Sequence, residues 1–275
     1  GEEPYWADYK AALLRRDLVW CISTTVRKEF LAWDKGFTGE GAPISDVVTP
    51  PFDSIMADSV PDPATRENSI VMISRNAPYK RLREALDVIV NKWDARQAPV
   101  TVHVAGENTE ALLRDFASGG GERIKLLCHG EIGERAKWGL LKSAKLLVHP
   151  SDFEGFGIPL SEAMYARTPV MAHPLPVYRD CFGDNFFEYT DTASMLKALD
   201  AVFDGWEDSP KELNALLDQA RAHVAKRYTL PRKRVRVLSL LGRHFRDVVA
   251  RSASAAVARA SGAAGEMRVA MVSSW

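Results

Sequence analysis

Short apolar runs alternate with segments of helical periodicity along most of the chain, from residue 69 onward. Apolar residues are continuous in the short runs and recur every three to four positions in the longer segments, a pattern that predicts buried strands and amphipathic helices. The predicted strands span residues 70–73, 100–105, 124–128, 146–149 and 170–172, and the predicted helices span 80–93, 109–116, 134–143, 159–165 and 194–203. Strands that alternate with helices form a parallel sheet with helices on both faces. We therefore expect an α/β fold.

The rest of the pattern predicts a chain of several parts. The expected order is the C-terminal part of another α/β domain (1–53), an interdomain linker (54–68), the main domain (69–208), C-terminal helices (209–250), a flexible Ser/Ala/Gly-rich linker (251–266) and the first strand of a following domain (267–275). Prolines and polar residues mark the first linker, and small residues mark the second, although its alanines also favour a longer helix. We expect a segment of a longer protein.

The composition limits the classes of function. The chain has 275 residues, of which 46% are hydrophobic and 26% charged, and its formal net charge is zero, so no overall field attracts nucleic acid. Three well-separated cysteines without metal or redox spacing indicate thiols of a reducing cytoplasm. The chain starts without a charged-then-apolar segment and lacks the roughly 20 continuous apolar residues that span a bilayer, so we expect neither secretion nor membrane spanning.

The densest chemical signal is the run from His149 to Met164, HPSDFEGFGIPLSEAM. It combines a strand end, a glycine-rich loop and a helix start. Pro159 suits the first helical turn, which places Glu162 in that turn and Glu154 in the loop before it. Both carboxylates should face one crevice, where Gly157 allows close approach of the backbone and the helix N-terminus offers free amides to a phosphate.

This run resembles the Glu-x7-Glu signature of the group-1 (family 4) retaining glycosyltransferases of the GT-B fold, and the resemblance covers about residues 18–228. It implies a Rossmann-like nucleotide-sugar-binding domain, preceded by the end of the acceptor-side Rossmann-like domain. In that family the first glutamate lies by the donor sugar and the second binds the ribose, which here are Glu154 and Glu162. The amides near Phe156, Gly157 and Ile158 would hold phosphate or sugar oxygens. A helix start with a stabilising acid is the simpler alternative.

A second signal is the loop Ser74 to Lys80, which follows a predicted strand and opens the next helix. It resembles the loop with which the family holds the donor diphosphate, so we expect Arg75 and Lys80 to stabilise the departing diphosphate. A solvated pair of cations is the alternative. A cation at a helix N-terminus is unfavourable, however, and a bound anion would explain it.

Weaker signals complete the predicted site. Gly130 and Glu131 follow another strand where the family often places the nucleotide base, and ordinary turn chemistry explains them equally well. Asp180 stands where the family commonly has glutamate, and we give it no catalytic role. The histidines show no metal-ligand spacing and there is no Asp-x-Asp motif, so we expect no metal and no cofactor.

The predicted function is retaining transfer of a hexosyl unit, with mannosyl favoured slightly, from a nucleoside-diphosphate sugar to a glycan or lipid-linked acceptor. This segment alone is expected to bind donor without completing the reaction, and the strand at 267–275 would open a second transferase unit. The basic run 232–236 allows peripheral contact with anionic lipid at the inner face of the membrane, although we favour a solvated helix face. The alternatives are a sugar-nucleotide epimerase or phosphorylase of the same architecture, and a non-catalytic nucleotide-sugar-binding module.

Overall fold

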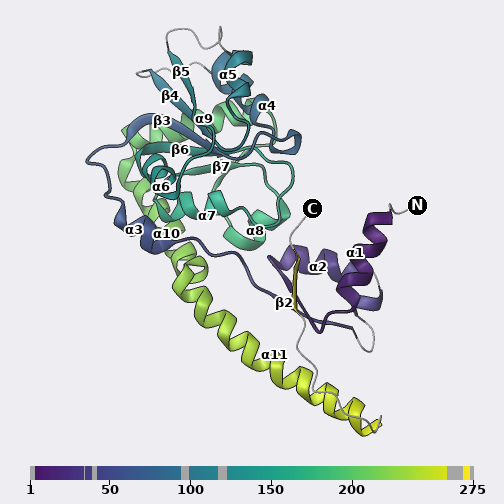
Figure 1. Cartoon of the computed structure of the whole chain (residues 1–275). Coiled ribbons are helices and arrows are strands. Elements are labelled where there is room, and N and C mark those ends of the chain that lie inside the picture. Colours follow the sequence, from purple (N-terminus) through teal and green to yellow (C-terminus); the bar gives the residue numbers. More distant parts are fainter. Residues whose placement is uncertain are drawn as a thin grey trace. The chain divides into compact units, whose positions relative to one another are not determined.

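The computed structural model describes residues 4–33, 35–38, 42–93, 99–116, 123–258 and 269–272. The chain divides into two compact units, Pro51–Thr229 and the combination of Gly1–Pro50 with Leu230–Trp275 (Figure 1). The larger unit includes the expected linker 54–68, in which Ser54–Ser59 forms helix α3. It also includes the first of the expected C-terminal helices, whereas the second belongs to the smaller unit.

The larger unit is built on a six-stranded sheet in the order β5-β4-β3-β6-β7-β8. All neighbouring strands pair in parallel, as predicted. The strands are β3 Glu67–Ile73, β4 Val100–Ala105, β5 Ile124–Cys128, β6 Ala144–His149, β7 Val170–Ala172 and β8 Phe187–Glu188. The pattern missed β8 because two residues are too short to show a periodicity.

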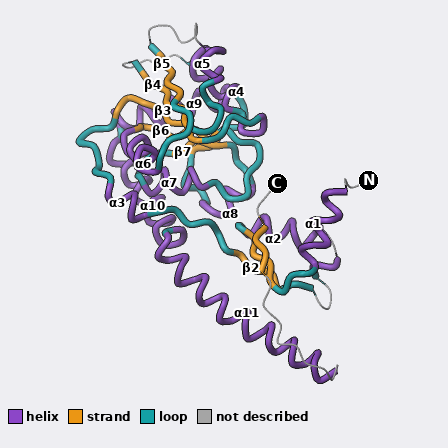
Figure 2. Tube along the Cα trace, in the orientation of Figure 1, coloured by secondary structure: helices purple, strands orange, loops and turns teal. Residues whose placement is uncertain are grey.

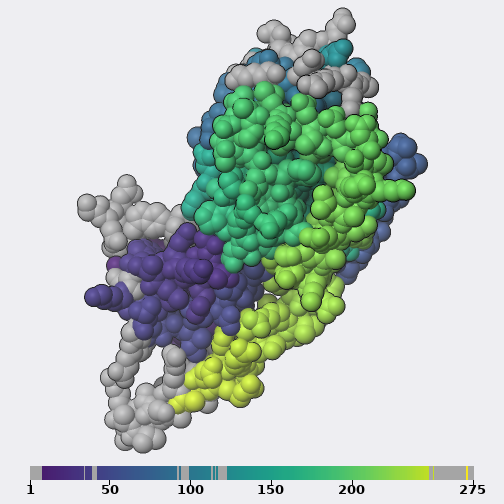
Figure 3. Space-filling model, turned by 180° about the vertical axis from the view of Figure 1, so that it is seen from behind, coloured from purple at the N-terminus to yellow at the C-terminus, as the bar shows by residue number. Residues whose placement is uncertain are grey.

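Helices cover both faces of this sheet (Figure 2). They are α4 Leu82–Asp87, α5 Ala111–Phe116, α6 Glu134–Ser143, α7 Ile158–Tyr165, α8 Pro176–Phe182, α9 Thr192–Asp208 and α10 Pro210–Tyr228. α4 continues as a π-helical turn, Val88–Lys92, and α9 packs beside it through Trp93 and Phe203, whose ring centroids are 5.0 Å apart. On the other face α10 packs on α7, and α6 lies between α7 and α3. Seen from behind, this unit presents mainly its later residues, coloured green (Figure 3).

One partly buried arginine ties two helix ends together. The Arg66 guanidinium lies at the C-termini of α6 and α7, where backbone carbonyls lack helical partners. It donates to the carbonyl oxygens of Leu141, Lys142, Ala144, Ala166 and Arg167 at 2.7–3.4 Å. Burial lowers the pKa of Arg66 to about 10, so the group stays charged at neutral pH. It stabilises the helix that carries Glu162.

The smaller unit holds a three-stranded parallel sheet in the order β2-β1-β9. Its elements are α1 Pro4–Leu14, β1 Leu18–Cys21, α2 Thr24–Trp33, β2 Ile44–Val47, α11 Leu230–Ala258 and β9 Val269–Val272. α11 packs on this sheet through Leu240, which is fully buried beside Leu18 and Trp20. The helix continues to Ala258, so the expected linker is wrong for 251–258, and 259–268 lie outside the described residues. The expected strand at 267–275 is β9, which pairs with β1 rather than standing in a separate sheet.

The loops at the carboxyl ends of the strands are joined to one another. The Gly106 amide, after β4, donates to the Gly130 carbonyl, after β5, at 2.7 Å, and the Ser74 amide, after β3, donates to the Ala105 carbonyl at 2.9 Å. Gly106 has a φ of 137°, and a Cβ there would lie 2.2 Å from the Ser74 carbonyl oxygen. Only glycine fits both the conformation and the space.

We predict that Arg66→Met lowers the free energy of unfolding of the larger unit by about 3 kcal/mol, because several buried carbonyls lose a charged donor together. Urea unfolding followed by circular dichroism measures it. Arg179→Met is the matched control, since Arg179 pairs with Asp184 and Glu188 on the surface and should change stability by less than about 1 kcal/mol. Equal effects of the two substitutions would contradict this role of Arg66.

Gly106→Ala should lower the unfolding free energy by about 2 kcal/mol or more, because the new methyl group meets the Ser74 carbonyl and the backbone is strained. Gly139→Ala is the control, since Gly139 lies within α6 with no atom within 4 Å of the added Cβ. It should stabilise the protein by about 0.5–1 kcal/mol. The same sign for both substitutions in a urea titration would refute the predicted close approach.

Candidate functional site

The sheet changes direction between β3 and β6. From β3 the chain proceeds to β4 and β5 on one side, and from β6 it proceeds to β7 and β8 on the other. In open α/β sheets the crevice beyond the carboxyl ends of the strands at such a switch point is the usual ligand site. The loop that follows β3 carries Arg75 and Lys80, and the loop that follows β6 carries Glu154. The fold therefore brings the two strongest sequence signals to one place.

Lys80 and Glu154 form an ion pair across this crevice. Their side chains are only 13% and 15% exposed. The same oxygen, Glu154 Oε1, lies 2.9 Å from His149 Nε2, at the end of β6. Lys80 and His149 therefore both contact Glu154, a pairing that the sequence did not predict.

The environment keeps Glu154 ionised. Burial alone would raise its pKa, but the hydrogen bond from His149 and the charge and hydrogen bond of Lys80 outweigh burial and lower it to about 2. A carboxylate that stays charged at neutral pH is a strong acceptor for hydroxyl groups. The crevice therefore holds a fixed negative charge beside a cation.

Arg75 belongs to the same loop as Lys80. It is exposed, and its guanidinium donates to the Tyr79 hydroxyl and lies 5.6 Å from the centre of that ring. The Tyr79 hydroxyl and the nearby Glu154 carboxylate both raise the pKa of Arg75. Lys80 Nζ lies 5.1 Å from the centre of the Tyr79 ring, so one tyrosine contacts both predicted phosphate-binding cations.

The predicted helix 80–93 is interrupted at its start, and this interruption sets the directions of the Lys80 and Arg81 side chains. Pro78–Lys80 forms a 3₁₀ turn, Arg81 adopts the left-handed conformation with a φ of 50°, and only then does α4 begin. Because of this break, neighbouring side chains diverge: Lys80 contacts Glu154, and Arg81 pairs with Asp152 at 3.0 Å.

Glu162 lies in α7 just beyond the first turn, not within that turn as predicted, because the helix already begins at Ile158; it is 3% exposed. Its partner is Lys137 on α6, whose Nζ lies 2.6 Å from Glu162 Oε1 and 2.8 Å from Glu134 Oε1. Burial raises the pKa of Glu162, and the Lys137 charge opposes that shift. No hydrogen bond between described residues joins this pair to the Glu154 cluster, so the two glutamates occupy separate polar clusters of one loop and helix.

The start of α7 offers free donors. The amides of Gly157 and Ile158 donate to no described residue, and Pro159 has no amide hydrogen. Gly157 has a φ of 97°, and a Cβ there would lie 2.8 Å from the Tyr178 ring. The Phe156 ring is buried against Phe182 and Tyr228, so only its backbone faces a ligand. Free amides at a helix N-terminus suit a phosphate.

Gly130 is buried in the turn after β5, with a φ of 63°, and Glu131 beside it is exposed. These positions are compatible both with the predicted contact with a nucleotide base and with ordinary turn chemistry.

A pair of histidines lies next to this turn. His129 Nε2 lies 2.9 Å from His103 Nδ1, and the two rings stack. In the described part of the chain, no three His, Cys, Asp or Glu side chains gather as a metal site would require.

Sequence reasoning missed three partners in this site: Tyr79, Lys137 and His149. His149 ends a predicted strand at the edge where ligands bind, which was a usable signal. Lys137 follows Glu134 by three positions and so shares its helix face, but nothing in that spacing indicates Glu162. Tyr79 carried no signal of its own.

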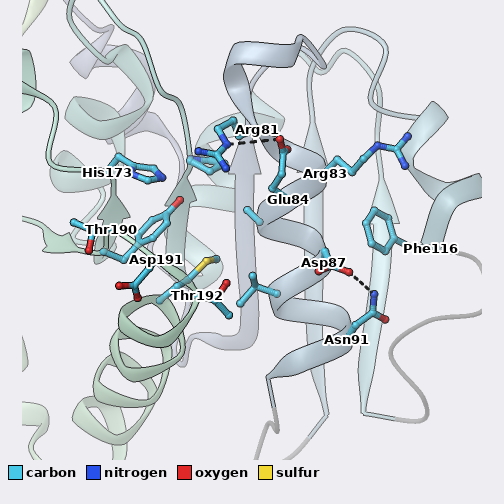
Figure 4. Close-up of a pocket in the computed structure, with 15 residues that line it drawn as sticks. Arg81, Arg83, Glu84, Asp87, Asn91, Phe116, His173, Thr190, Asp191 and Thr192 are labelled. Atoms are coloured by element: carbon cyan, nitrogen blue, oxygen red, sulfur yellow. Dashed lines mark hydrogen bonds and ion pairs between the residues drawn. The ribbon is translucent and has the colours of Figure 1, made fainter.

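A separate hollow of about 690 Å³ follows α4 and the start of α9 (Figure 4). Its charged groups are already paired: Arg81 with Asp152 and Glu84, and Asp87 with Asn91. Figure 4 shows Arg81 and Glu84 turned toward each other. None of Arg75, Lys80, Glu154 and Glu162 lines it, so we place the functional site at the switch-point crevice.

Among the described residues, no helix combines the length and the apolar character needed to cross a membrane.

Comparisons with known proteins identify the family and the fold of the chain. The family described as glycosyl transferases group 1 matches residues 57–223, more than half of the chain. Phosphatidyl-myo-inositol mannosyltransferase from Mycobacterium leprae (strain TN) is 33% identical over 130 residues, which are 46% of this chain and 34% of that protein. The chain thus spans about a third of the length of this relative.

Solved structures share the fold. HepE of Anabaena, in complex with UDP and glucose, matches 82% of this chain and 63% of its own, with a TM-score of 0.63 and 19% identity. Sucrose-phosphate synthase from Thermosynechococcus elongatus matches 87% of this chain and 61% of its own, with a TM-score of 0.66 and 17% identity. The predicted GT-B-type α/β fold is confirmed, and the chain belongs to the glycosyl transferases group 1 family.

Proposed function

We propose that this chain binds a nucleoside-diphosphate sugar in the switch-point crevice and is the donor-binding part of a retaining hexosyltransferase. The observation that carries the proposal is the buried, ionised Glu154 held by Lys80 beside the free amides at the start of α7. A fixed carboxylate can accept hydrogen bonds from the hydroxyl groups of the sugar. The neighbouring cations and free amides can bind the phosphates, so together these groups match the two ends of such a donor.

Each group has a role in the proposed transfer. The bond between the anomeric carbon and the diphosphate oxygen breaks, and the acceptor oxygen takes its place on that carbon. Arg75 and Lys80 offset the charge left on the diphosphate, so we expect neither metal nor cofactor. Glu154 orients the sugar, Glu162 binds the ribose, and the amides of Gly157 and Ile158 hold phosphate oxygens. Gly130 and Glu131 would lie beside the base.

The named relatives support a hexosyl donor. One is a mannosyltransferase that acts on phosphatidyl-myo-inositol by name, and another was solved with UDP and glucose. A mannosyl donor and a glycan or lipid-linked acceptor are therefore proposed for the whole protein, in the cytoplasm. On α11, Val235 and Leu238 are 70% and 62% exposed within a basic stretch, and contact with anionic lipid there stays a prediction.

Three other functions remain as outcomes of experiment. An epimerase would convert a free nucleotide sugar without acceptor, and a phosphorylase would cleave a glycan with phosphate. A non-catalytic module would bind donor without turnover even in the full-length protein. Family membership favours transfer over all three.

The donor site is tested by isothermal titration of the chain with UDP-, GDP- and ADP-sugars without added metal. We expect one nucleotide to bind, and Glu162→Gln and Lys80→Met each to weaken it about tenfold or more, since each removes a charged contact. Glu207→Gln, on the exposed surface of α9, should bind like the parent chain. Binding that survives both site substitutions unchanged would contradict the proposed crevice.

Retention is tested on the full-length protein by NMR of the first product formed. We expect the anomeric configuration of the donor to be preserved. An inverted product would refute a retaining mechanism while leaving the donor site standing.

A further inference from the structure

The two carboxylate oxygens of Glu154 are not equivalent. Oε1 accepts from Lys80 and lies 2.9 Å from His149 Nε2, whereas Oε2 makes no hydrogen bond to a described residue. The donors come from opposite sides of the switch point, Lys80 after β3 and His149 at the end of β6. Oε1 is therefore the anchored atom, and Oε2 is the one left for a ligand.

The geometry assigns the proton of His149. A charged imidazole carries a proton on both ring nitrogens, whereas a neutral one carries a single proton, so only the neutral form leaves the position of the proton open. If that proton were on Nδ1, the Nε2 lone pair would face the Glu154 carboxylate at 2.9 Å, and two acceptors would repel each other. Nδ1 is buried and has no hydrogen-bond partner, so it provides no reason to keep the proton there. The proton belongs on Nε2, which donates to Glu154.

The imidazole has little freedom to turn away. His149 is 1% exposed and ends a central strand, and its ring meets the fully buried Tyr178 edge-on with centroids 6.2 Å apart. Ser151 Oγ lies 3.2 Å from the same Nε2. Lys80, by contrast, has a flexible stem and three donor hydrogens, and the proposed function directs it to the diphosphate. His149 is thus the contact that stays on Glu154 while Lys80 turns to a phosphate.

We propose that His149 is a positioning residue: its Nε2–H holds Oε1 of Glu154 and so presents Oε2 to a hydroxyl group of the donor sugar. The contact between His149 and Glu154 is present in the structure of the free protein, whereas the contact with the sugar rests on the proposed function. Loss of His149 should therefore affect recognition of the sugar and leave recognition of the nucleotide intact.

The hold itself is tested in the free protein by ¹³C NMR titration of the Glu154 carboxyl. In the parent chain its pKa should be about 2. His149→Leu and the polar but shorter His149→Asn should raise the proton affinity about tenfold, because a hydrogen bond to the charged form is lost. His149→Gln, whose amide can replace Nε2–H, should restore the low value, and Ser151→Ala, which contacts His149 but not Glu154, is the control. Unchanged titration in both His149→Leu and His149→Asn would overturn the proposal.

The effect on the sugar is tested by comparing UDP with UDP-glucose and GDP with GDP-mannose. His149→Asn should bind the bare nucleotide with the affinity of the parent chain. The additional affinity that the sugar provides should fall about tenfold in His149→Asn and should be unchanged in His149→Gln. Equal weakening of nucleotide and nucleotide sugar would indicate a structural role and overturn the proposal. If the parent chain binds none of these ligands, the proposed function fails, while the carboxyl titration still decides whether His149 holds Glu154.

Discussion

The ion pair between Lys80 and Glu154 is the contact on which the site depends. Both side chains are largely buried, and a buried charge is stable only when it is paired and hydrogen-bonded. The pair therefore requires the loops after β3 and β6 to meet, and the Asp152 amide donates to the Tyr79 carbonyl at 2.9 Å between them. With these loops joined, the start of α7 and its free amides face the same crevice. Removing Glu154 would leave Lys80 without its carboxylate partner, and removing Lys80 would leave Glu154 with His149 alone.

The pKa values of the two glutamates of one motif shift in opposite directions because their neighbours differ. Glu154 has two donors on one oxygen, and they lower its pKa to about 2 in spite of burial. Glu162 is more deeply buried, and burial raises its pKa although Lys137 opposes the shift. Such divergence between two carboxyl groups commonly separates their roles. This difference fits two roles. Glu154 would be a permanently charged group beside the sugar, and Glu162 would be a carboxylate whose charge depends on Lys137.

Much of the larger unit could be predicted because buried parallel strands are continuous apolar runs, and β4, β5 and β7 have the predicted bounds. Both loops were expected at the carboxyl ends of parallel strands, but the contact of Lys80 with Glu154 also requires β3 and β6 to be neighbours, which the sequence did not predict. The helix break at Arg81 was not predictable, because a left-handed arginine has no sequence signature. The pairing of β9 with β1 and the contacts of His149 and Lys137 depend on tertiary packing, which local pattern does not specify.

The most direct measurement is a crystal structure of this chain with the nucleotide or nucleotide sugar that binds it in solution. We predict the diphosphate between Arg75, Lys80 and the first amides of α7, with the ribose on Glu162 and the sugar on Oε2 of Glu154. A ligand bound in the hollow between α4 and α9, with Lys80 and Glu154 still paired and untouched, would contradict it.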